Sequence, residues 1–406
     1  MLPYNINFGF LAYTVGTDLK VVDLFCGCGG LSLSFELAGY SIVAAFDKWE
    51  HAVTCYNSFL AHNAQIMDLS DVEKSVAIIK SIETDLIIGG PPCQEFSHAG
   101  RRQEGVQADL TCSFAEIVTL ISPRCFVMEN VSRARSSEAY KKARATYKEN
   151  GYGLTEVLLD ASRYGAPQKR KRFFCIGIKG ETDGFLFDAL VNNEVEPITV
   201  RQYFNKIGLP LSIDVYYRHP TTYTRRAVFS VDQPAPTVRG VNRPKPSTYK
   251  THSGDALSKH QGSEARALTI QERAAIQTFP TEFSFEQLDI SKANLDQIIG
   301  NAVPVVLGQA VAKCLKEHLN GSTGASTNGF AEWLREIKGY SDRSISDVYS
   351  RLRRAKKLLP ERKLDRYFIA DLNGVEEFSA SASDIKSQIR RAIRLYIEYQ
   401  ETSLIP

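Results

Sequence analysis

One cysteine of this chain stands in a setting that suits a nucleophile. Cys93 follows residues 87–92 (Ile-Ile-Gly-Gly-Pro-Pro), an apolar run that ends in two glycines and two prolines. Sites form at the carboxyl ends of buried strands in open α/β sheets, and a thiolate is a strong nucleophile. The alternative is a buried thiol that acts as a small hydrophobic residue, the usual fate of cysteine. The rigid loop favours the reactive interpretation, because packing alone needs no Gly-Gly-Pro-Pro segment.

Acidic and basic side chains follow or enter other apolar runs. Glu129 comes directly after the run 125–128, which places a carboxylate at the same predicted sheet edge as Cys93. Gln168, Arg170 and Arg172 alternate along a further predicted strand, so their side chains should share one face. The alternatives are an acid at a helix N-terminus and a solvated basic patch. Taken alone, the arginines favour the basic patch.

A glycine-rich segment at 25–30 predicts a nucleoside-binding turn. Glycines at the start of a helix let a ligand approach the backbone closely. Asp47 lies twenty positions after Gly27, at the end of the next predicted strand, where an acid can hold a ribose diol. Ser32 replaces the third glycine of a dinucleotide fingerprint, which weakens an NAD site. A turn that serves only the fold remains the alternative.

These residues lie within an alternation of apolar runs and helical patterns. Five runs read as buried strands: 20–25, 41–46, 85–88, 125–128 and 172–178. The alternation predicts an α/β fold with a mostly parallel sheet that is covered on both faces. The segment 181–265 is rich in Pro, Thr, Tyr and Arg and predicts a small irregular or β-rich domain without clear helices.

The remainder of the chain is predicted to be helical. Residues 266–279 have a helical pattern, and 296–319 form an amphipathic pattern interrupted near Gly300 and Pro304. By composition, 320–329 is a flexible linker before a separate helical extension. The predicted division is therefore a catalytic domain at 1–180 and 266–319, a second domain at 181–265, the linker 320–329 and the extension 330–406.

Composition excludes several classes of protein. The 406 residues carry a net charge of +3, so there is no global polyanion-binding signal. No apolar run approaches the roughly 20 residues needed to span a bilayer, and no signal peptide is evident, so we expect a cytoplasmic protein without a membrane. Eight scattered cysteines indicate reduced thiols. Cys26 and Cys28 form a lone C-x-C, so we expect no metal site.

Taken in chain order, the motifs resemble the DNA (cytosine-5-)-methyltransferase family of bacterial restriction-modification type. They are D-L-F-x-G-x-G-G at 23–30, G-G-P-P-C-Q-x-F-S at 89–97, E-N-V at 129–131, Q-x-R-x-R at 168–172 and G-N-A-V-P at 300–304. The resemblance covers about residues 20–319, and the block 266–280 is similar to the family segment that supports the recognition domain. It implies a Rossmann-like S-adenosylmethionine-dependent methyltransferase fold with a small DNA-recognition domain.

The resemblance also implies roles for the reactive side chains. Cys93 would add to C6 of a cytosine flipped out of duplex DNA, because C5 alone attacks a methyl sulfonium too weakly. Glu129 would stabilise charge at N3. Arg170 and Arg172 would hold the base carbonyl and a nearby phosphate.

S-adenosyl-L-methionine is the implied cofactor. Its implied contacts are Phe25, Gly27, Gly29, Asp47, Trp49, Asp68, Pro91, Asn301 and Val303. Lys48 stands where the family usually has a hydrophobic residue over the adenine, so the residue that covers this ring is left open, with Trp49 next to it.

Two basic regions are candidates for nucleic-acid binding. Residues 216–262 hold eight Lys or Arg against two acids, interleaved with tyrosines, which suits phosphate and base contacts. A basic loop face is the alternative. Residues 351–366 of the extension also hold eight Lys or Arg against two acids, which fits a solvated face, an auxiliary DNA-binding module or a docking surface. The candidate DNA contacts are Gln94, Ser97, Arg218, Arg225, Arg226, Arg239 and Arg243.

Other functions remain open at this point. A cytosine-5 methyltransferase that acts on tRNA would use the same chemistry, and a non-catalytic DNA-binding regulator could have kept the fold. The first interpretation implies double-stranded DNA as partner and a companion restriction endonuclease that need not contact the chain. We expect a monomer.

Overall fold

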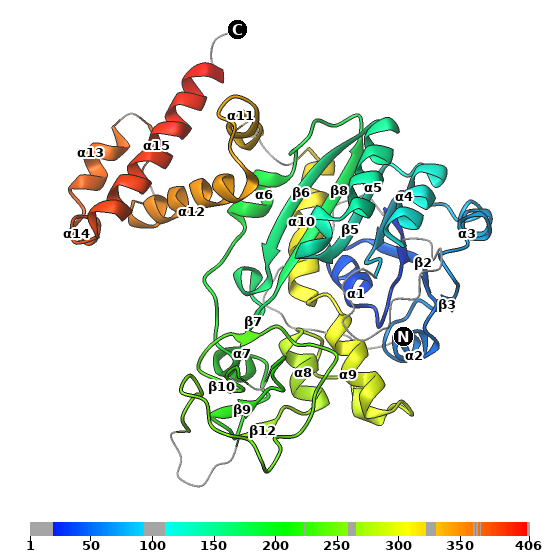
Figure 1. Ribbon diagram of the computed structural model, residues 1–406. Coiled ribbons are helices and arrows are strands. Elements are labelled where there is room, and N and C mark those ends of the chain that lie inside the picture. Colours follow the sequence, from blue (N-terminus) through cyan, green and yellow to red (C-terminus); the bar gives the residue numbers. More distant parts are fainter. Residues whose placement is uncertain are drawn as a thin grey trace.

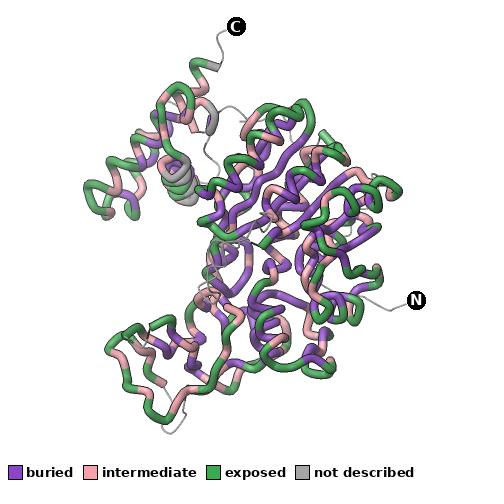
Figure 2. The backbone as a smooth tube through the Cα atoms, turned by 45° about the vertical axis from the view of Figure 1, so that its right-hand side comes forward, coloured by how far each residue is buried: buried purple, intermediate pink, exposed green. Residues whose placement is uncertain are grey.

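A computed structural model of the chain describes residues 19–92, 110–222, 224–258, 265–321, 330–359, 362, 364–365 and 367–403. Cys93, Gln94 and Ser97 lie outside these residues. Three parts are visible: an α/β part, a smaller lobe of short strands and loops, and a group of C-terminal helices (Figure 1). The small lobe and the C-terminal helices lie at opposite ends of the α/β part in both views (Figures 1 and 2).

The described strands of the central sheet lie in the order β3-β2-β1-β4-β5-β8-β6. The strands β1 to β5 pair in parallel, whereas β8 runs antiparallel between β5 and β6. The bounds are β1 Lys20–Leu24, β2 Ser41–Asp47, β3 Ala64–Ile66, β4 Leu86–Gly89, β5 Cys125–Val131, β6 Tyr152–Asp160 and β8 Lys171–Lys179. The predicted mostly parallel α/β sheet is confirmed, and the five predicted runs are β1, β2, β4, β5 and β8.

Two strands of the central sheet, β3 and β6, were not predicted, and they lie at its two edges. β3 has only three residues, and two of them are exposed. β6 interrupts its apolar pattern with Gly153, Thr155 and Glu156. Because an edge strand does not need to be apolar on both faces, neither segment shows the continuous apolar run of a central strand.

Helices cover both faces of this sheet (Figure 1). Alternate residues of each strand enter different clusters, so Val21 packs with one layer and Val22 with the other. One layer holds α1 Gly30–Glu36, α6 Phe187–Asn192 and α10 Val305–Leu319. The other holds α3 Val72–Ile79, α4 Leu110–Ile121 and α5 Glu138–Glu149. The predicted coverage on both faces is confirmed.

A further apolar cluster joins the sheet to the small lobe. It contains side chains of α2 Glu50–Phe59, α7 Val200–Lys206, α8 Ile270–Ile276 and α9 Lys292–Asn301. The predicted interruption near Gly300 and Pro304 is confirmed, since α9 ends and α10 begins there. Among the described residues, the stretch Lys292–Leu319 is long and apolar enough to cross a membrane, but 67% of its most apolar window is buried inside the protein.

The small lobe is built from short strands. In the described chain, β9 Val215–Tyr217, β10 Val228–Ser230 and β12 Arg266–Ala267 form one sheet, and β11 Ala235–Pro236 pairs with β7 Gln168–Lys169. The expectation that 181–265 lacks clear helices was wrong, because α6 and α7 lie there. Thr199 and Gln202 form a capping box at the start of α7, a signal visible in the sequence. Three short 3-10 helices complete the described elements: η2 Ser132–Ser136, η3 Ala161–Tyr164 and η4 Phe285–Gln287.

The C-terminal extension is helical, as predicted. Its helices are α11 Phe330–Glu336, α12 Asp342–Leu358, α13 Phe368–Asn373, α14 Glu376–Ser379 and α15 Ser383–Ser403. One face of α12 is buried at Val348, Leu352 and Ala355, which lie at helical spacing. The extension is not separate from the core, however. The Tyr349 hydroxyl donates a hydrogen bond to the Asp188 carboxylate of α6, and the Tyr349 ring packs against Phe187 at 5.5 Å.

Candidate active site

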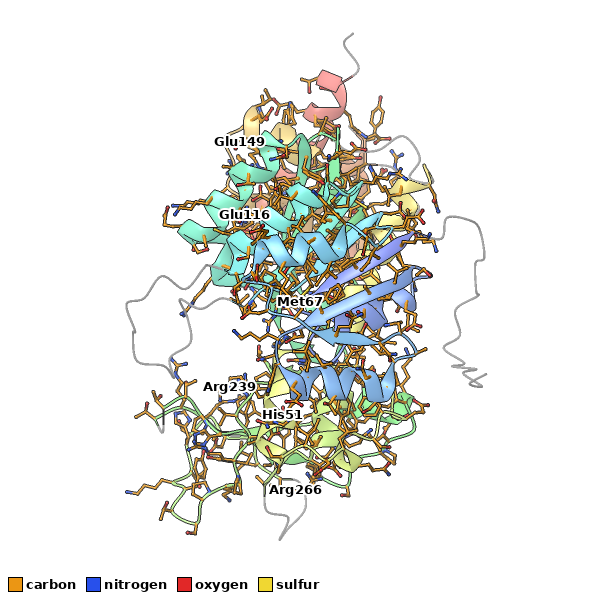
Figure 3. All side chains as sticks on the ribbon, turned by 90° about the vertical axis from the view of Figure 1, so that its right-hand side faces the viewer. His51, Met67, Glu116, Glu149, Arg239 and Arg266 are labelled. Carbon is orange, nitrogen blue, oxygen red and sulfur yellow. The ribbon has the colours of Figure 1, made fainter. Side chains whose placement is uncertain are left out.

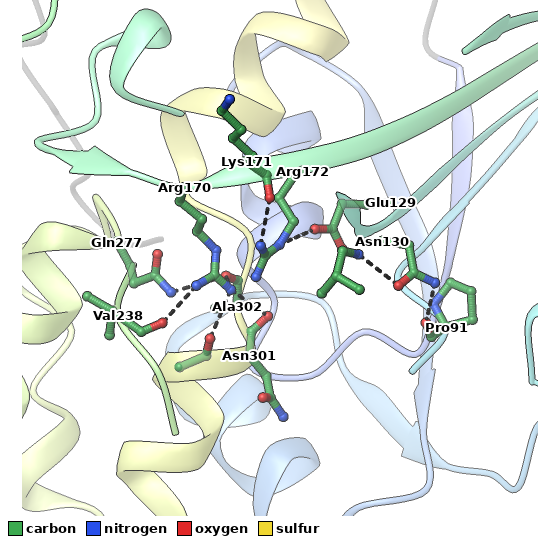
Figure 4. A network of polar contacts seen from close by, with 12 residues as sticks. Pro91, Glu129, Asn130, Arg170, Lys171, Arg172, Val238, Gln277, Asn301 and Ala302 are labelled. Carbon is green, nitrogen blue, oxygen red and sulfur yellow. Dashed lines mark hydrogen bonds and ion pairs between the residues drawn. The ribbon is translucent and has the colours of Figure 1, made fainter. Parts of the chain in front are cut away.

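The loop that follows β4 is held against the end of β5. A side chain at Gly89 would lie 2.2 Å from a backbone carbonyl of β1, so only glycine fits. A Cβ at Gly90 would lie 3.2 Å from Oε2 of Glu129. The Asn130 side chain donates to the Pro91 carbonyl oxygen at 3.0 Å (Figure 4). Asn130, near the end of β5, therefore holds the backbone at Pro91, two residues before Cys93.

Glu129 and Arg172 form a buried ion pair. The Arg172 Nε lies 2.8 Å from Glu129 Oε1, and the two side chains are 12% and 8% exposed (Figure 4). The antiparallel pairing of β5 with β8 brings the two residues together. Burial raises the pKa of Glu129, and the charges of Arg172 and Arg170 oppose this rise. Burial lowers the pKa of Arg172, and Glu129 opposes that fall. Burial and the neighbouring arginines therefore act on the protonation of Glu129 in opposite directions, beside the loop that leads to Cys93.

Arg170 lies in a different position from the one predicted at a phosphate. Its side chain is 1% exposed, and its guanidinium donates to backbone carbonyls of Val238 at 2.8 Å, Gly300 at 2.9 Å and Ala302 at 3.1 Å (Figure 4). The alternation along the segment is as predicted, since Gln168 and Arg170 are buried and Arg172 is half-buried, whereas Lys169 and Lys171 are exposed. Of the two arginines, only Arg172 reaches Glu129.

The glycine-rich turn after β1 has an unusual backbone. Phe25, Gly27 and Gly29 have φ angles of 59°, 56° and 85°, all in the left-handed region. For Phe25 this conformation costs on the order of 1–3 kcal/mol, and such strain gathers at ligand sites. Apart from Gly27 and its two chain neighbours, no heavy atom of the described residues lies within 4 Å of the Cβ position at Gly27. The turn therefore leaves open space next to its backbone.

Asp47 lies at the end of β2, directly against this turn. Its Oδ2 accepts a hydrogen bond from the Gly27 N–H at 2.9 Å, and its Oδ1 accepts one from the Trp49 N–H at 2.8 Å. Burial raises the pKa of Asp47, and these backbone donors oppose the rise. Each carboxylate oxygen keeps a further lone pair that can accept from a ligand hydroxyl. Trp49 is half-buried beside it.

Lys48 and Asp68 form an ion pair at the same sheet edge. The Lys48 Nζ lies 2.7 Å from Asp68 Oδ2, and both side chains are largely exposed. The hydrogen bond from Lys48 lowers the pKa of Asp68 to about 2, with help from Ser70. The lysine that departs from the family pattern is therefore in contact with Asp68, one of the predicted cofactor contacts.

The last motif closes onto the glycine-rich turn. A Cβ at Gly30 would lie 2.8 Å from the Val303 carbonyl oxygen, so α1 begins against the chain between α9 and α10. Asn301 is exposed, and its Oδ1 accepts from Gln297 at 3.0 Å. The structure thus brings Val303, from the far end of the family region, next to the residues after β1.

One buried acid was missed by the sequence analysis. Asp23 is fully buried and accepts a hydrogen bond from the Ser32 hydroxyl at 2.6 Å, which in turn accepts from the Tyr56 hydroxyl at 2.9 Å. Burial raises the pKa of Asp23 to about 8. Ser32, noticed only as a departure from the dinucleotide fingerprint, is the partner of this acid. Their place nine residues apart in one motif was the available signal.

The candidate DNA-binding arginines fall into two groups. Arg218 donates to the Thr237 carbonyl at 2.9 Å, and Arg239 donates to the His219 carbonyl, so both help to hold the lobe together. Arg225 and Arg243 are exposed, and the described chain offers neither side chain a hydrogen bond or ion pair. Arg226 lies over the Phe229 ring at 4.2 Å. Figure 3 shows Arg239 on the side of the lobe nearer the sheet.

Within the described ranges, no group of three or more His, Cys, Asp or Glu side chains is placed to hold a metal ion.

Comparison with known proteins assigns a family. The family model for C-5 cytosine-specific DNA methylases matches residues 19–317. The type II methyltransferase M.HgiDI of Herpetosiphon aurantiacus is 47% identical over 304 residues, which are 74% of this chain and 96% of that protein. M.HindV of Haemophilus influenzae is 46% identical over 73% of this chain and 96% of its own length. The extension begins after the matched region.

Solved structures agree on the fold. The Dnmt2 methyltransferase of S. pombe matches with a TM-score of 0.56 at 20% identity, over 74% of this chain and 99% of that one. A putative DNA modification methyltransferase from an E. coli prophage matches with a TM-score of 0.54 at 23% identity, over 74% and 99%. At these identities the likeness supports the fold alone. The motifs, the fold and the matched residues together show that this chain belongs to the C-5 cytosine-specific DNA methylases, as its sequence motifs predicted.

Proposed function

We propose that this enzyme methylates C5 of cytosine in a specific duplex DNA sequence, with S-adenosyl-L-methionine as methyl donor and Cys93 as nucleophile. The observation that carries the proposal is the buried Glu129–Arg172 pair, 2.8 Å apart, beside the Gly-Gly-Pro-Pro loop that leads to Cys93. An acid and a cation at the base of a nucleophile loop suit a reaction in which negative charge develops on a ring.

The residues at the cofactor edge fit a nucleoside-containing methyl donor. The open space at Gly27 can admit a ligand to the backbone, and Asp47 keeps acceptor capacity for a ribose diol. Asp68 can accept from an adenine amino group, and Phe25, Gly29, Trp49, Pro91, Asn301 and Val303 complete the proposed contacts. When bound, the cofactor supplies an electrophilic methyl group. The chain's part is to hold it at the carboxyl ends of β1 and β2.

The chain's own residues then activate the base. In the proposed reaction the Cys93 thiolate forms a bond to C6, and the electron pair of the C5–C6 double bond moves toward C5 and N3. Glu129 provides a proton at N3, and Arg172 holds the base carbonyl and keeps the carboxyl group in place. After C5 has gained the methyl group, a base removes the C5 proton, and the returning electron pair expels Cys93. Flipping the cytosine costs a few kcal/mol of unstacking.

The small lobe is proposed to read the DNA. We propose that 181–265 is the target-recognition domain between the two catalytic segments 1–180 and 266–319, with the α6 region packing on the sheet. Arg225, Arg226 and Arg243 are proposed DNA contacts, together with Gln94 and Ser97 of the loop that bears Cys93. Arg218 and Arg239 are proposed to contribute while they also hold the lobe.

The biological setting follows from the relatives. Because similar proteins are type II methyltransferases, we propose that the enzyme protects host DNA from a companion restriction endonuclease. We also propose a cytoplasmic monomer that meets the endonuclease only through shared DNA sites.

Bisulfite sequencing of DNA from cells that express the protein tests the proposal. The expected result is full conversion protection at one short sequence, which also identifies the target. A matched strain expressing Cys93→Ser should show no protected cytosine. Unmodified DNA in the parent strain, together with methylated tRNA, would instead support RNA as the substrate.

A further inference from the structure

Three buried polar side chains meet where the small lobe joins the α/β part. Gln168 Nε2 donates to Gln277 Oε1 at 2.8 Å. Arg170 and Gln277 both donate to the Ala302 carbonyl oxygen (Figure 4). Exposure is 0% for both glutamines and 1% for Arg170. These three residues are called the junction cluster below.

The junction cluster binds the lobe through one residue. The Val238 N–H donates to Gln168 Oε1 at 2.7 Å, and the Val238 carbonyl accepts from Arg170 at 2.8 Å. Both polar backbone groups of Val238 are therefore held by side chains of the catalytic part. Val238 directly precedes Arg239, and its segment leads to the exposed Arg243.

The same cluster binds the segment that closes the cofactor site. The last carbonyls of α9 have no partners within their own helix. Gln277 Nε2 donates to the carbonyl of Ile299 at 2.6 Å, and Arg170 donates to those of Gly300 and Ala302. The negative end of a helix also compensates a buried guanidinium. Asn301 and Val303, the proposed cofactor contacts, lie within this segment.

The two bound segments also touch each other directly. A Cβ at Gly300 would lie 2.3 Å from the Gly240 nitrogen, so the backbones approach as closely as glycine permits. Arg273 reinforces the contact, because it pairs with Asp296 of α9 and donates to the carbonyl of Arg239. A movement of the lobe near Val238 must therefore be transmitted to the end of α9.

We propose that Arg170 is a positioning residue that couples target recognition by the lobe to cofactor binding by the segment 300–303. This inference rests on the proposed function, since it takes the lobe to bind DNA and the segment to bind the cofactor. DNA that orders the lobe orders the end of α9 through Arg170, so the two ligands should strengthen each other. Thermodynamic coupling of this kind is reciprocal and typically amounts to roughly 5–150-fold.

The test compares the full-length parent with Arg170→Lys, which keeps a positive charge but cannot bridge carbonyls on both sides. The probe ligands are S-adenosylhomocysteine and a duplex that carries the site mapped by bisulfite sequencing. Calorimetry gives the affinity for S-adenosylhomocysteine with and without the duplex. The expected result is that the parent's gain in affinity on adding DNA falls to about twofold or less in the variant. Lys179→Gln, at the far end of β8, the strand that follows Arg170, should keep the parent's gain.

A second readout separates positioning from a phosphate contact. If Arg170 touched a phosphate, Arg170→Lys or Arg170→Gln would change the DNA affinity, and the glutamine variant would lower the salt slope by about 0.9. We expect an unchanged slope in the lysine variant. Two results would overturn the proposal. One is a gain in S-adenosylhomocysteine affinity on adding DNA that is unchanged in Arg170→Lys, and the other is a salt slope of DNA binding that falls by about 0.9 in Arg170→Gln.

A third variant covers failure to fold. Gln277→Met removes the donor to Ile299 while keeping a side chain of similar length, and it should also reduce the coupling. If Arg170→Lys does not fold and Gln277→Met keeps the full coupling, the proposal is wrong. If the parent itself binds neither ligand, it is the proposed function that fails.

Discussion

The small lobe and the C-terminal extension each hold a basic segment, and in both regions some cations, such as Arg218 and Arg239 of the lobe, bond within the region. In the lobe, the side chains of Arg225 and Arg243 are exposed and have no hydrogen-bond or ion-pair partner among the described residues. In the extension, several cations bond within the extension itself. These pairs are Lys338 with Glu398, Arg362 with Asp371, Arg390 with Asn373 and Arg391 with the Tyr340 hydroxyl. Basic composition alone therefore does not identify a DNA surface.

Their attachment to the core differs as well. The lobe is joined by the junction cluster, next to the segment that closes the proposed cofactor site. The extension packs against α6 at the other end of the molecule, through Tyr349 and Phe187 (Figure 1). The hypothesis that the extension is an auxiliary DNA-binding module loses support, because α12 is anchored to the core on the α6 side. We propose instead that the extension stabilises the α6 side of the fold.

The largest effect on catalysis is expected at Cys93, which lies in neither of the two basic regions. Cys93→Ser should lower methyl transfer by roughly a thousandfold or more, because a hydroxyl is a far weaker nucleophile than a thiolate. A covalent complex with DNA that contains 5-fluorocytosine should form with the parent and not with the variant. Near-normal turnover by the serine variant would contradict the proposed role of Cys93 as nucleophile.

Paired arginine variants test the comparison itself. Arg225→Ala with Arg243→Ala should weaken binding to the target duplex by about tenfold and lower the salt slope by about 1.8, as expected for two lost phosphate contacts. Arg351→Ala with Arg354→Ala, the matched change in α12, should leave affinity and slope nearly unchanged. Fluorescence anisotropy at several salt concentrations measures both. Equal losses in the two double variants would restore the extension as an auxiliary DNA-binding module.

The sequence predicted features that depend on neighbouring residues, and it did not predict contacts between residues far apart in the chain. The motif order identified the family, and the buried strands followed from local apolar runs. The position of Arg170 could not be predicted, because its acceptors come from Val238 and Ala302, 68 and 132 residues away. The anchoring of the extension was missed for the same reason, since Tyr349 meets Asp188 across 161 residues.

Tyr349→Phe sharpens the structural role proposed for the extension. Removing the hydroxyl leaves the Asp188 carboxylate with one donor fewer in a buried site, which should cost about 1–3 kcal/mol of unfolding free energy. Urea denaturation measures the loss, and the exposed Tyr367→Phe is the matched control. The DNA salt slope should not change. A variant with normal stability but weaker DNA binding would show that the contact serves DNA rather than the fold.

The smallest effect is expected at Lys48. This lysine forms an ion pair, as several cations of the extension do, but it lies beside the proposed cofactor site. Its ion pair with Asp68 is largely exposed, and such pairs contribute at most about 1 kcal/mol. If the methylene stem of Lys48 covers the adenine in place of the family's hydrophobic residue, Lys48→Met keeps that cover. Its affinity for S-adenosylhomocysteine should then stay within about fivefold of the parent, an upper bound set by the pair's energy. Lys48→Glu places a second carboxylate beside Asp68, so it should weaken binding more, and salt should reduce the difference. Calorimetry at two salt concentrations measures both variants. A large loss in Lys48→Met with no salt dependence would mean that the ammonium group itself contacts the cofactor.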